Sequence, residues 1–332
     1  MNTRQIRWAL LLVIIIISLA ALGFFARIPR EVFWPYFAMI VAFICGGLAV
    51  KNEIGHLEWF ERFLALGPMF FAVPLVGFAA EHFVLNGVMV PMIPSWVPGR
   101  PFWIYLTGAA LIAAAASLFL NRKVALSGML LGVMILSFVV ILHIPRVIAN
   151  PRDRFSWAVA VRDFCFATAA FVLAATRVKQ RSGFNKDSIT FVAALVIGAA
   201  LVFFSVEHFL HPDFAPGVPL RKVTPTYIPL RSLWGYIAGL GLALGGISVV
   251  IRWRSGLAAC GLGLLYICLV LFIYLPMMLQ SWFNAGSRIE GLNFFLDTLM
   301  FGGVVVILAG ALSPAAHGRN SSENLLAAKE AS

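Results

Sequence analysis

Long runs of apolar residues recur along the whole chain, and each is long enough to cross a lipid bilayer. A transmembrane helix needs about 20 apolar residues to cross a hydrocarbon core of roughly 30 Å. Ten such runs are present, at residues 8–26, 33–50, 66–86, 102–120, 124–144, 155–176, 188–210, 233–251, 257–279 and 291–313. The sequence therefore predicts an all-α, polytopic membrane protein with about ten transmembrane helices.

The composition agrees with a membrane protein and excludes two other classes. Only 12% of the 332 residues are charged, whereas soluble domains carry about 25%. The apolar residues do not alternate in short segments, which disfavours a β-barrel. The net charge of +11 is spread over short loops, so no nucleic-acid partner is expected and the lipid bilayer is the expected surroundings.

Basic residues near the ends of the runs indicate how the chain is oriented. Arg4 and Arg7 precede the first run, which is longer than the roughly 7–15 apolar residues of a signal peptide, so we expect a retained span. More than half of the 25 Lys and Arg residues fall on the same side as this start. The positive-inside rule then favours a multi-pass protein with both termini cytoplasmic. We expect it in a bacterial-type inner (plasma) membrane.

A short polar motif occurs twice within the apolar runs. Phe78-Ala-Ala-Glu81-His82-Phe83 recurs as Phe204-Ser-Val-Glu207-His208-Phe209, an offset of 126 residues. After a loop with five extra residues in the second copy, further matches follow in the same order. They are Pro94, Pro98, Arg100, Trp103, Gly108 and Pro145 with Pro225, Pro229, Arg231, Trp234, Gly239 and Pro276, and then Arg154 and Asp163 with Arg288 and Asp297.

These matches predict two tandem four-helix bundles plus an N-terminal helix pair. The expected boundaries are a helix pair with its connector at residues 1–60, a first unit at 61–180, a second unit at 186–313 and a disordered tail at 314–332. Because each unit has an even number of spans, the two copies are expected to be parallel repeats. This disfavours an inverted-repeat transporter.

The repeated polar residues are the candidate functional site. Ionisable groups within spans are costly unless they pair inside the bundle. By topology, eleven of them gather in the outer half of the two units: Glu81, His82, Arg100, His143, Arg154, Asp163, Glu207, His208, Arg231, Arg288 and Asp297. We expect Glu81 and Asp163 to be partnered by some of His82, Arg100, Arg154 and Arg162.

The same residues fit two interpretations. A carboxylate beside an imidazole suits proton exchange near neutral pH. A buried Glu–Arg pair can equally fix the register of two helices, and an interfacial Arg can extend to lipid head groups. The four cysteines lie within apolar runs without a Cys-x-x-Cys, so we expect small buried side chains and no metal site.

The stretch from Glu81 to Arg146 resembles the DoxX-like family of small four-helix membrane proteins. The residues that carry the resemblance are Glu81-His82-Phe83, Pro94-Ser-Trp-Val-Pro98, Trp103-Ile-Tyr-Leu-Thr-Gly108 and the short turn at Asn121-Arg-Lys123. The resemblance covers residues 66–177 and, more weakly, the second copy. It implies a membrane subunit of a quinone-linked oxidoreductase, with a quinone as the ligand and a soluble redox protein as the partner.

Two other functions stay open at this point. The protein is either a transporter or lipid/small-molecule binding protein, with its pathway between the two units, or a non-catalytic membrane scaffold. The sequence carries no cofactor motif and departs from the DoxX-like pattern by its duplication, its two extra spans and Glu81 within a helix.

Overall fold

The computed structural model describes residues 28–178 and 185–313, and regular structure in these ranges is helical. The helices before the repeated region are α2 (Arg30–Ile54) and α3 (Trp59–Ala65). The first predicted unit holds α4 (Gly67–Val84), α5 (Asn86–Met89), η1 (Val90–Met92), α6 (Arg100–Phe119), α7 (Val124–Phe138), η2 (Val139–His143), α8 (Ile144–Ala149) and α9 (Arg154–Ala175). The second holds α10 (Lys186–Leu210), α11 (Arg231–Val250), α12 (Ser255–Leu269), η4 (Val270–Tyr274), α13 (Leu275–Ser281) and α14 (Arg288–Leu312).

Nine helical segments in the described ranges are long and apolar enough to cross a membrane. They coincide, within a few residues at each end, with nine of the ten predicted spans, and the all-α polytopic fold is thereby confirmed. The predicted first span at 8–26 and the predicted tail at 314–332 lie outside the described residues. Two boundaries differ more: α3 joins α4 in a single span, Trp59–Val84, where the sequence predicted a span from residue 66, and the span predicted to end at residue 144 continues to Ala149.

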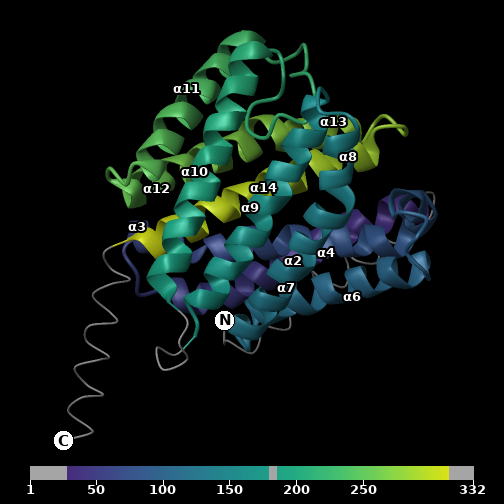
Figure 1. The fold of residues 1–332 in the computed structure, drawn as a ribbon, viewed down its shortest axis with the longest axis horizontal. Coiled ribbons are helices and arrows are strands. Elements are labelled where there is room, and N and C mark those ends of the chain that lie inside the picture. Colours follow the sequence, from purple (N-terminus) through teal and green to yellow (C-terminus); the bar gives the residue numbers. More distant parts are fainter. Residues whose placement is uncertain (1–27, 179–184, 314–332) are drawn as a thin grey trace, which may run out of the picture.

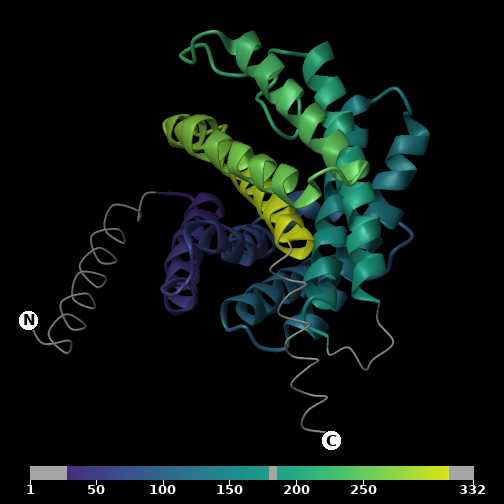
Figure 2. The ribbon, with the colours of Figure 1, turned by 90° about the vertical axis from the view of Figure 1, so that its left-hand side faces the viewer.

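Two helices occupy the centre of the molecule, α9 and α14. Helix α14 is the most buried of the described spans, and it crosses the middle of the ribbon (Figures 1 and 2). It packs against α4 and α9 from the first predicted unit as well as α12 from its own, and α9 in turn packs against α7 and α10. The two units therefore share an extensive interface, and the duplication itself remains a prediction.

The core between these helices is aromatic. The ring of Phe301 on α14 lies 6.3 Å from Phe166 on α9, 5.4 Å from Phe204 on α10 and 5.0 Å from Tyr266 on α12. All four side chains are buried. Offset and tilted ring pairs at such distances contribute more than their buried area alone. This cluster joins helices from both predicted units.

Both predicted units contain a π-helix at the same relative position. Residues Val139–His143 and Val270–Tyr274 are π-helical, and a proline follows two residues later in each case, Pro145 and Pro276. Proline has no N–H to donate within a helix, and a wider turn before it lets the chain continue. The prediction that the fifth span ends at residue 144 was wrong for this reason, because the helix resumes as α8 and continues to Ala149.

Glycine allows the closest approach between α14 and α4. A Cβ atom at Gly303 would lie 2.6 Å from the backbone nitrogen of Phe71 and 2.9 Å from the carbonyl carbon of Phe70. Gly128 in α7 serves the same purpose, since a Cβ there would lie 2.7 Å from the carbonyl oxygen of Ala170. Small residues at helix crossings are the usual means of close packing in membranes.

We predict that Gly303→Ala destabilises the protein by about 1–3 kcal/mol, because the added methyl group meets backbone rather than a movable side chain. Gly310→Ala in the same helix is the matched control, since nothing lies within 4 Å of its would-be Cβ. Thermal unfolding of the detergent-solubilised variants would measure the difference. Equal midpoints for the two variants would contradict the close α4–α14 crossing.

Candidate functional site

A chain of polar side chains runs through the centre of the protein, where α9 meets α14. Arg162 on α9 donates from Nε to Oδ1 of Asp163 and from Nη1 to Oδ2 of Asp297 on α14, both at 2.8 Å. The guanidinium also lies 5.6 Å from the centre of the Phe166 ring. One arginine therefore holds two carboxylates, one from each predicted unit.

His143 extends the chain toward the surface. Its Nε2 lies 2.8 Å from Oδ2 of Asp163, so the same carboxylate contacts both Arg162 and the imidazole. His143 is the last residue of the π-helix, whose extra residue per turn changes the direction of the side chains that follow. About 15% of the His143 side chain and 14% of the Asp163 side chain are exposed.

Glu81 forms the other end of the chain. Its side chain is buried on α4. The side-chain amide of Asn293 is oriented with its nitrogen toward this carboxylate, so that Nδ2 of Asn293 donates to Oε1 of Glu81 at 2.5 Å and to Oε2 at 3.1 Å. Asn293 lies four residues before Asp297 on α14, so the two share one helix face. We call the set His143, Asp163, Arg162, Asp297, Asn293 and Glu81 the central acidic chain.

The central acidic chain has more acids than bases. It contains three carboxyl groups, one guanidinium and one imidazole. Charged groups inside a membrane protein cost several kcal/mol each unless they are paired. Arg162 compensates for one negative charge, so the remaining carboxyl groups require protons or another cation. This excess is the main chemical property of the site.

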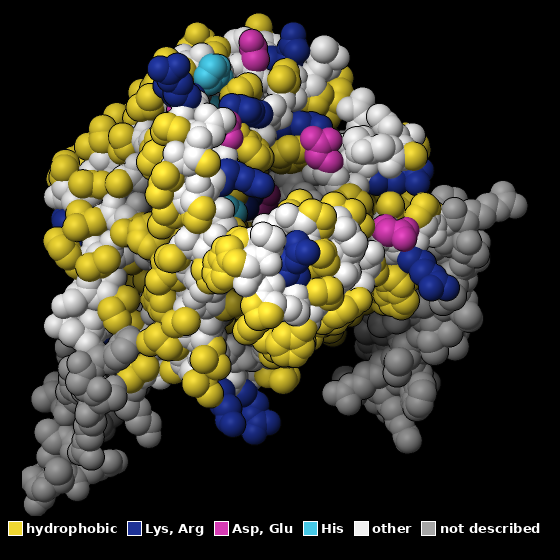
Figure 3. All heavy atoms as spheres, turned by 45° about the vertical axis from the view of Figure 1, so that its right-hand side comes forward, with side chains coloured by type: hydrophobic (Ala, Val, Ile, Leu, Met, Phe, Trp, Pro, Cys, Tyr) yellow, Lys and Arg dark blue, Asp and Glu magenta, His cyan; other side chains and the backbone are white. Residues whose placement is uncertain are grey.

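Charged side chains gather on one face of the molecule. Figure 3 shows Lys, Arg, Asp, Glu and His side chains gathered around a hollow in a largely hydrophobic surface. The partial exposure of His143, Asp163 and Asp297 is consistent with access from such a hollow. The chain is therefore buried between helices without being sealed.

Arg154 makes a second ion pair between the predicted units. Its Nη1 donates to Oε1 of Glu207 on α10; 51% of the Arg154 side chain is exposed and 4% of the Glu207 side chain. Arg154, one of the four candidate partners predicted for Glu81 and Asp163, therefore pairs with neither of them. Of the proposed partners, only Arg162 contacts Asp163, and Glu81 is bound by Asn293 instead.

His82 and His208 occupy equivalent positions but make different contacts. Nδ1 of His82 donates to the carbonyl oxygen of Phe78 in its own helix, at 2.7 Å. Nε2 of His208 lies 3.0 Å from the backbone nitrogen of Gly217, whose N–H donates to it, and 3.1 Å from its carbonyl oxygen. Neither histidine contacts the glutamate that precedes it, because adjacent residues on a helix point about 100° apart.

The loop between α10 and α11 folds into the second predicted unit. Ala215, Val218 and Leu220 of this loop are buried. Tyr274 of the second π-helix donates from its hydroxyl to the carbonyl oxygen of Pro216 at 3.0 Å. In this unit the tyrosine stands where the first unit has His143, and it fixes a loop instead of a carboxylate.

The remaining predicted site residues lie at the ends of helices. Arg288 donates from Nε to the carbonyl oxygen of Trp282 at 2.7 Å and stacks on that ring, while Tyr36 of α2 donates to the carbonyl oxygen of Arg288 at 2.9 Å. Among the described residues, the side chains of Arg100 and Arg231 make no hydrogen bond or ion pair, and both residues are the first of their helices. The structure does not bring these two arginines to the central acidic chain.

Asp153 connects the start of α9 to the loop between α10 and α11. It accepts from the hydroxyl of Ser156 at 2.5 Å and from Arg221 at 2.7 Å. The Ser156 hydrogen bond, followed by the charge of Arg221, lowers the pKa of this carboxyl. Its contribution to stability is therefore present above the ordinary Asp pKa and is lost as the pH falls through the lowered value.

The prediction of the site from the sequence missed Asn293. A lone amide four residues before a candidate acid is a weak signal, and Asn293 has no counterpart in the first unit, where Val159 occupies the aligned position. No set of three His, Cys, Asp or Glu side chains in the described ranges could hold a metal ion. The four cysteines are free.

The helices and the buried ionisable residues together define a polytopic integral membrane protein. Residues 71–159 match the model of a domain of unknown function, DUF8561. This match begins in α4 and ends in α9, so it includes Glu81 and His143 but stops before Arg162. No curated protein matches the chain, and no solved structure does.

Removal of the central arginine should be costly. We predict that Arg162→Gln destabilises the protein by about 3–5 kcal/mol, because it leaves two buried carboxyl groups without their shared partner. Adding Asp297→Asn should recover part of the loss. Arg100→Gln is the control and should change stability by no more than about 0.5 kcal/mol. Thermal unfolding in detergent checks this, and an unchanged midpoint for Arg162→Gln would contradict the role of the ion pairs.

Proposed function

We propose that this protein exchanges protons within the membrane at the central acidic chain. The observation that carries the proposal is the excess of three carboxyl groups over one guanidinium between α4, α9 and α14. In a low-dielectric interior, taking up a proton costs less than keeping an unpaired carboxylate. The chain is thus suited to hold protons and to release them when its surroundings change.

His143 is suited to connect the chain to water. It is partly exposed and contacts Asp163 directly. Imidazole gains and loses a proton near neutral pH, which makes it the usual carrier between solvent and a buried acid. A proton would pass from solvent to His143, then to the Asp163 side of the Arg162 ion pairs, with Asp297 and Glu81 as the inner acceptors.

The resemblance to DoxX-like proteins supports a role in a quinone-linked oxidoreductase. Reduction of a quinone to a quinol takes up two electrons and two protons. A soluble redox partner would supply the electrons. The residues of this chain would supply the protons, and the proposal assigns only this proton exchange to them.

A transporter is the second candidate, and one observation favours it. The ion pairs Arg162–Asp297 and Arg154–Glu207 both bridge the two predicted units. A relative movement of the units would break these pairs and change which carboxyl groups hold protons. Coupling between protonation and such a movement is the basis of proton-driven transport.

Infrared spectroscopy tests for protons in the central acidic chain. At neutral pH the wild type should show a carboxylic-acid C=O band that shifts in deuterium oxide. Glu81→Gln or Asp297→Asn should reduce this band, because each removes a proposed proton acceptor. Glu290→Gln is the control, since this carboxyl group lies at the start of α14, with 53% of its side chain exposed, and is 3.5 Å from Lys222. A wild type without the band would refute the proposal.

Proton uptake by proteoliposomes separates the three functions. With a pH-sensitive dye inside, Asp163→Asn and His143→Gln should slow uptake at least about tenfold, since a positioned acid–base group typically contributes about a hundredfold or more. Acceleration of wild-type uptake by a quinone together with an electron donor that reduces it would favour the oxidoreductase, and acceleration by a solute gradient would favour the transporter. Folded variants that take up protons at the wild-type rate would leave only the scaffold.

A further inference from the structure

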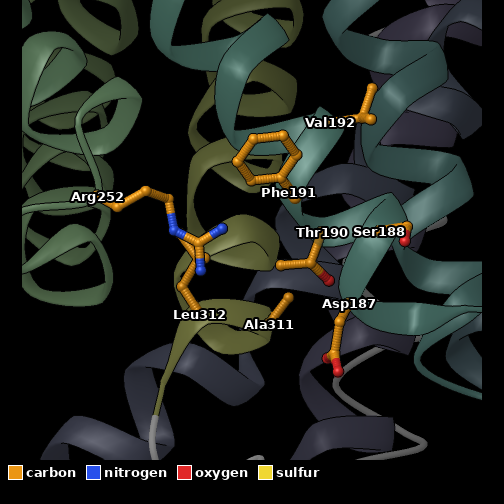
Figure 4. Close-up of a pocket in the computed structure, with 8 residues that line it drawn as sticks. All are labelled: Asp187, Ser188, Thr190, Phe191, Val192, Arg252, Ala311 and Leu312. Carbon is orange, nitrogen blue, oxygen red and sulfur yellow. The ribbon is translucent and has the colours of Figure 1, made fainter.

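A second polar site lies at the end of the bundle where α10 begins and α11 and α14 end. The pocket has a volume of about 390 Å³. This volume is near the lower end of the range found for ligand pockets. Its lining is Asp187, Ser188, Thr190, Phe191, Val192, Arg252, Ala311 and Leu312 (Figure 4). None of these residues belongs to the central acidic chain, so the two sites are independent.

Arg252 supplies the positive side of the pocket. It lies two residues after the last residue of α11, Val250, and holds a left-handed backbone conformation with φ of 63°. Its guanidinium lies 5.6 Å from the centre of the Phe191 ring, a cation–π contact that fixes the side chain between α11 and α10. In Figure 4 Arg252 reaches in from one side, opposite the residues of α10.

The opposite side carries a carboxylate and hydroxyl groups from the first turn of α10. Asp187 and Ser188 are exposed. The Thr190 hydroxyl is buried and has no hydrogen-bond partner within the described ranges. The first amides of α10 are already occupied, because the Asn185 side chain accepts from the backbone N–H groups of Asp187 and Ser188. An anion in this pocket would therefore depend on Arg252 and the hydroxyl groups.

The pocket opens onto the surface of the helices that faces lipid. Phe191 is 45% exposed and Val192 is 54% exposed, and both lie in the span Lys186–Leu210. Apolar side chains exposed on a span contact acyl chains. The charged groups lie beside them at the helix ends, which is the level of the lipid head groups. This arrangement favours a lipid over a soluble phosphate compound as the ligand.

We propose that this pocket binds the head group of a phospholipid with a primary ammonium group, as in phosphatidylethanolamine. The phosphate pairs with the guanidinium of Arg252. The ammonium group pairs with the carboxylate of Asp187, and the acyl chains lie along Phe191 and Val192. A guanidinium and a carboxylate on opposite sides of one pocket match a ligand that carries both charges, and they disfavour a purely anionic lipid.

Native mass spectrometry of the full-length protein in detergent tests the proposal. The protein is titrated separately with phosphatidylethanolamine, phosphatidylcholine and phosphatidylglycerol of identical acyl chains, and with soluble phosphoethanolamine. The wild type should retain the ethanolamine lipid at least about fivefold better than the other two lipids, because choline cannot donate hydrogen bonds and glycerol carries no charge. Soluble phosphoethanolamine should bind weakly.

Three variants identify the residues involved. Arg252→Gln should abolish the retention of the ethanolamine lipid, and Asp187→Asn should remove the preference over choline while leaving some binding. Arg254→Gln is the matched control, since this nearby arginine stacks on Trp253 and does not line the pocket. Thermal unfolding verifies that each variant is folded.

Several outcomes would overturn the proposal. Equal retention of the three lipids by the wild type would show that the head group is not recognised. Retention unchanged in Arg252→Gln would place the lipid elsewhere on the protein. Binding of soluble phosphoethanolamine as strong as that of the lipid would identify a site for a free phosphate compound.

Discussion

The structure depends on one guanidinium held between two carboxylates in the interior of a membrane protein. Arg162 binds Asp163 on its own helix and Asp297 on α14, and in this way it joins the two predicted units between their central helices. In a medium of low dielectric constant, such a group is tolerated only with good geometry and full pairing. The aromatic cluster of Phe166, Phe204, Tyr266 and Phe301 packs between the same helices and keeps α9 and α14 together.

The two π-helices have the same backbone geometry but position side chains with different roles. In both units a proline interrupts the regular hydrogen bonding, and a wider turn precedes it. The last residue of that turn is His143 in one unit and Tyr274 in the other. The histidine contacts a carboxylate, whereas the tyrosine donates to the backbone of a buried loop. The same backbone geometry thus positions an acid–base group in one half and a structural group in the other.

The long loop before α11 makes the second predicted unit differ from the first. Its five extra residues allow Ala215, Val218 and Leu220 to reach the interior, where His208 and Tyr274 hold the backbone. The equivalent loop of the first half is shorter, and His82 there bonds within its own helix. As a result, the structure has one central acidic chain that draws residues from both halves, rather than two similar sites.

The sequence by itself determined the nine described spans. They depend on a local property, the length of each apolar run, which needs no knowledge of the neighbours. It also identified Glu81, Asp163 and Asp297 as acids within spans, because charge in an apolar run is visible directly. Only the tertiary structure decided which partner each acid has. Arg154 pairs with Glu207, and Asn293 pairs with Glu81. Such contacts depend on how each helix is rotated and where it crosses its neighbours. Packing at residues such as Gly303 sets this arrangement, and no single run of residues encodes it.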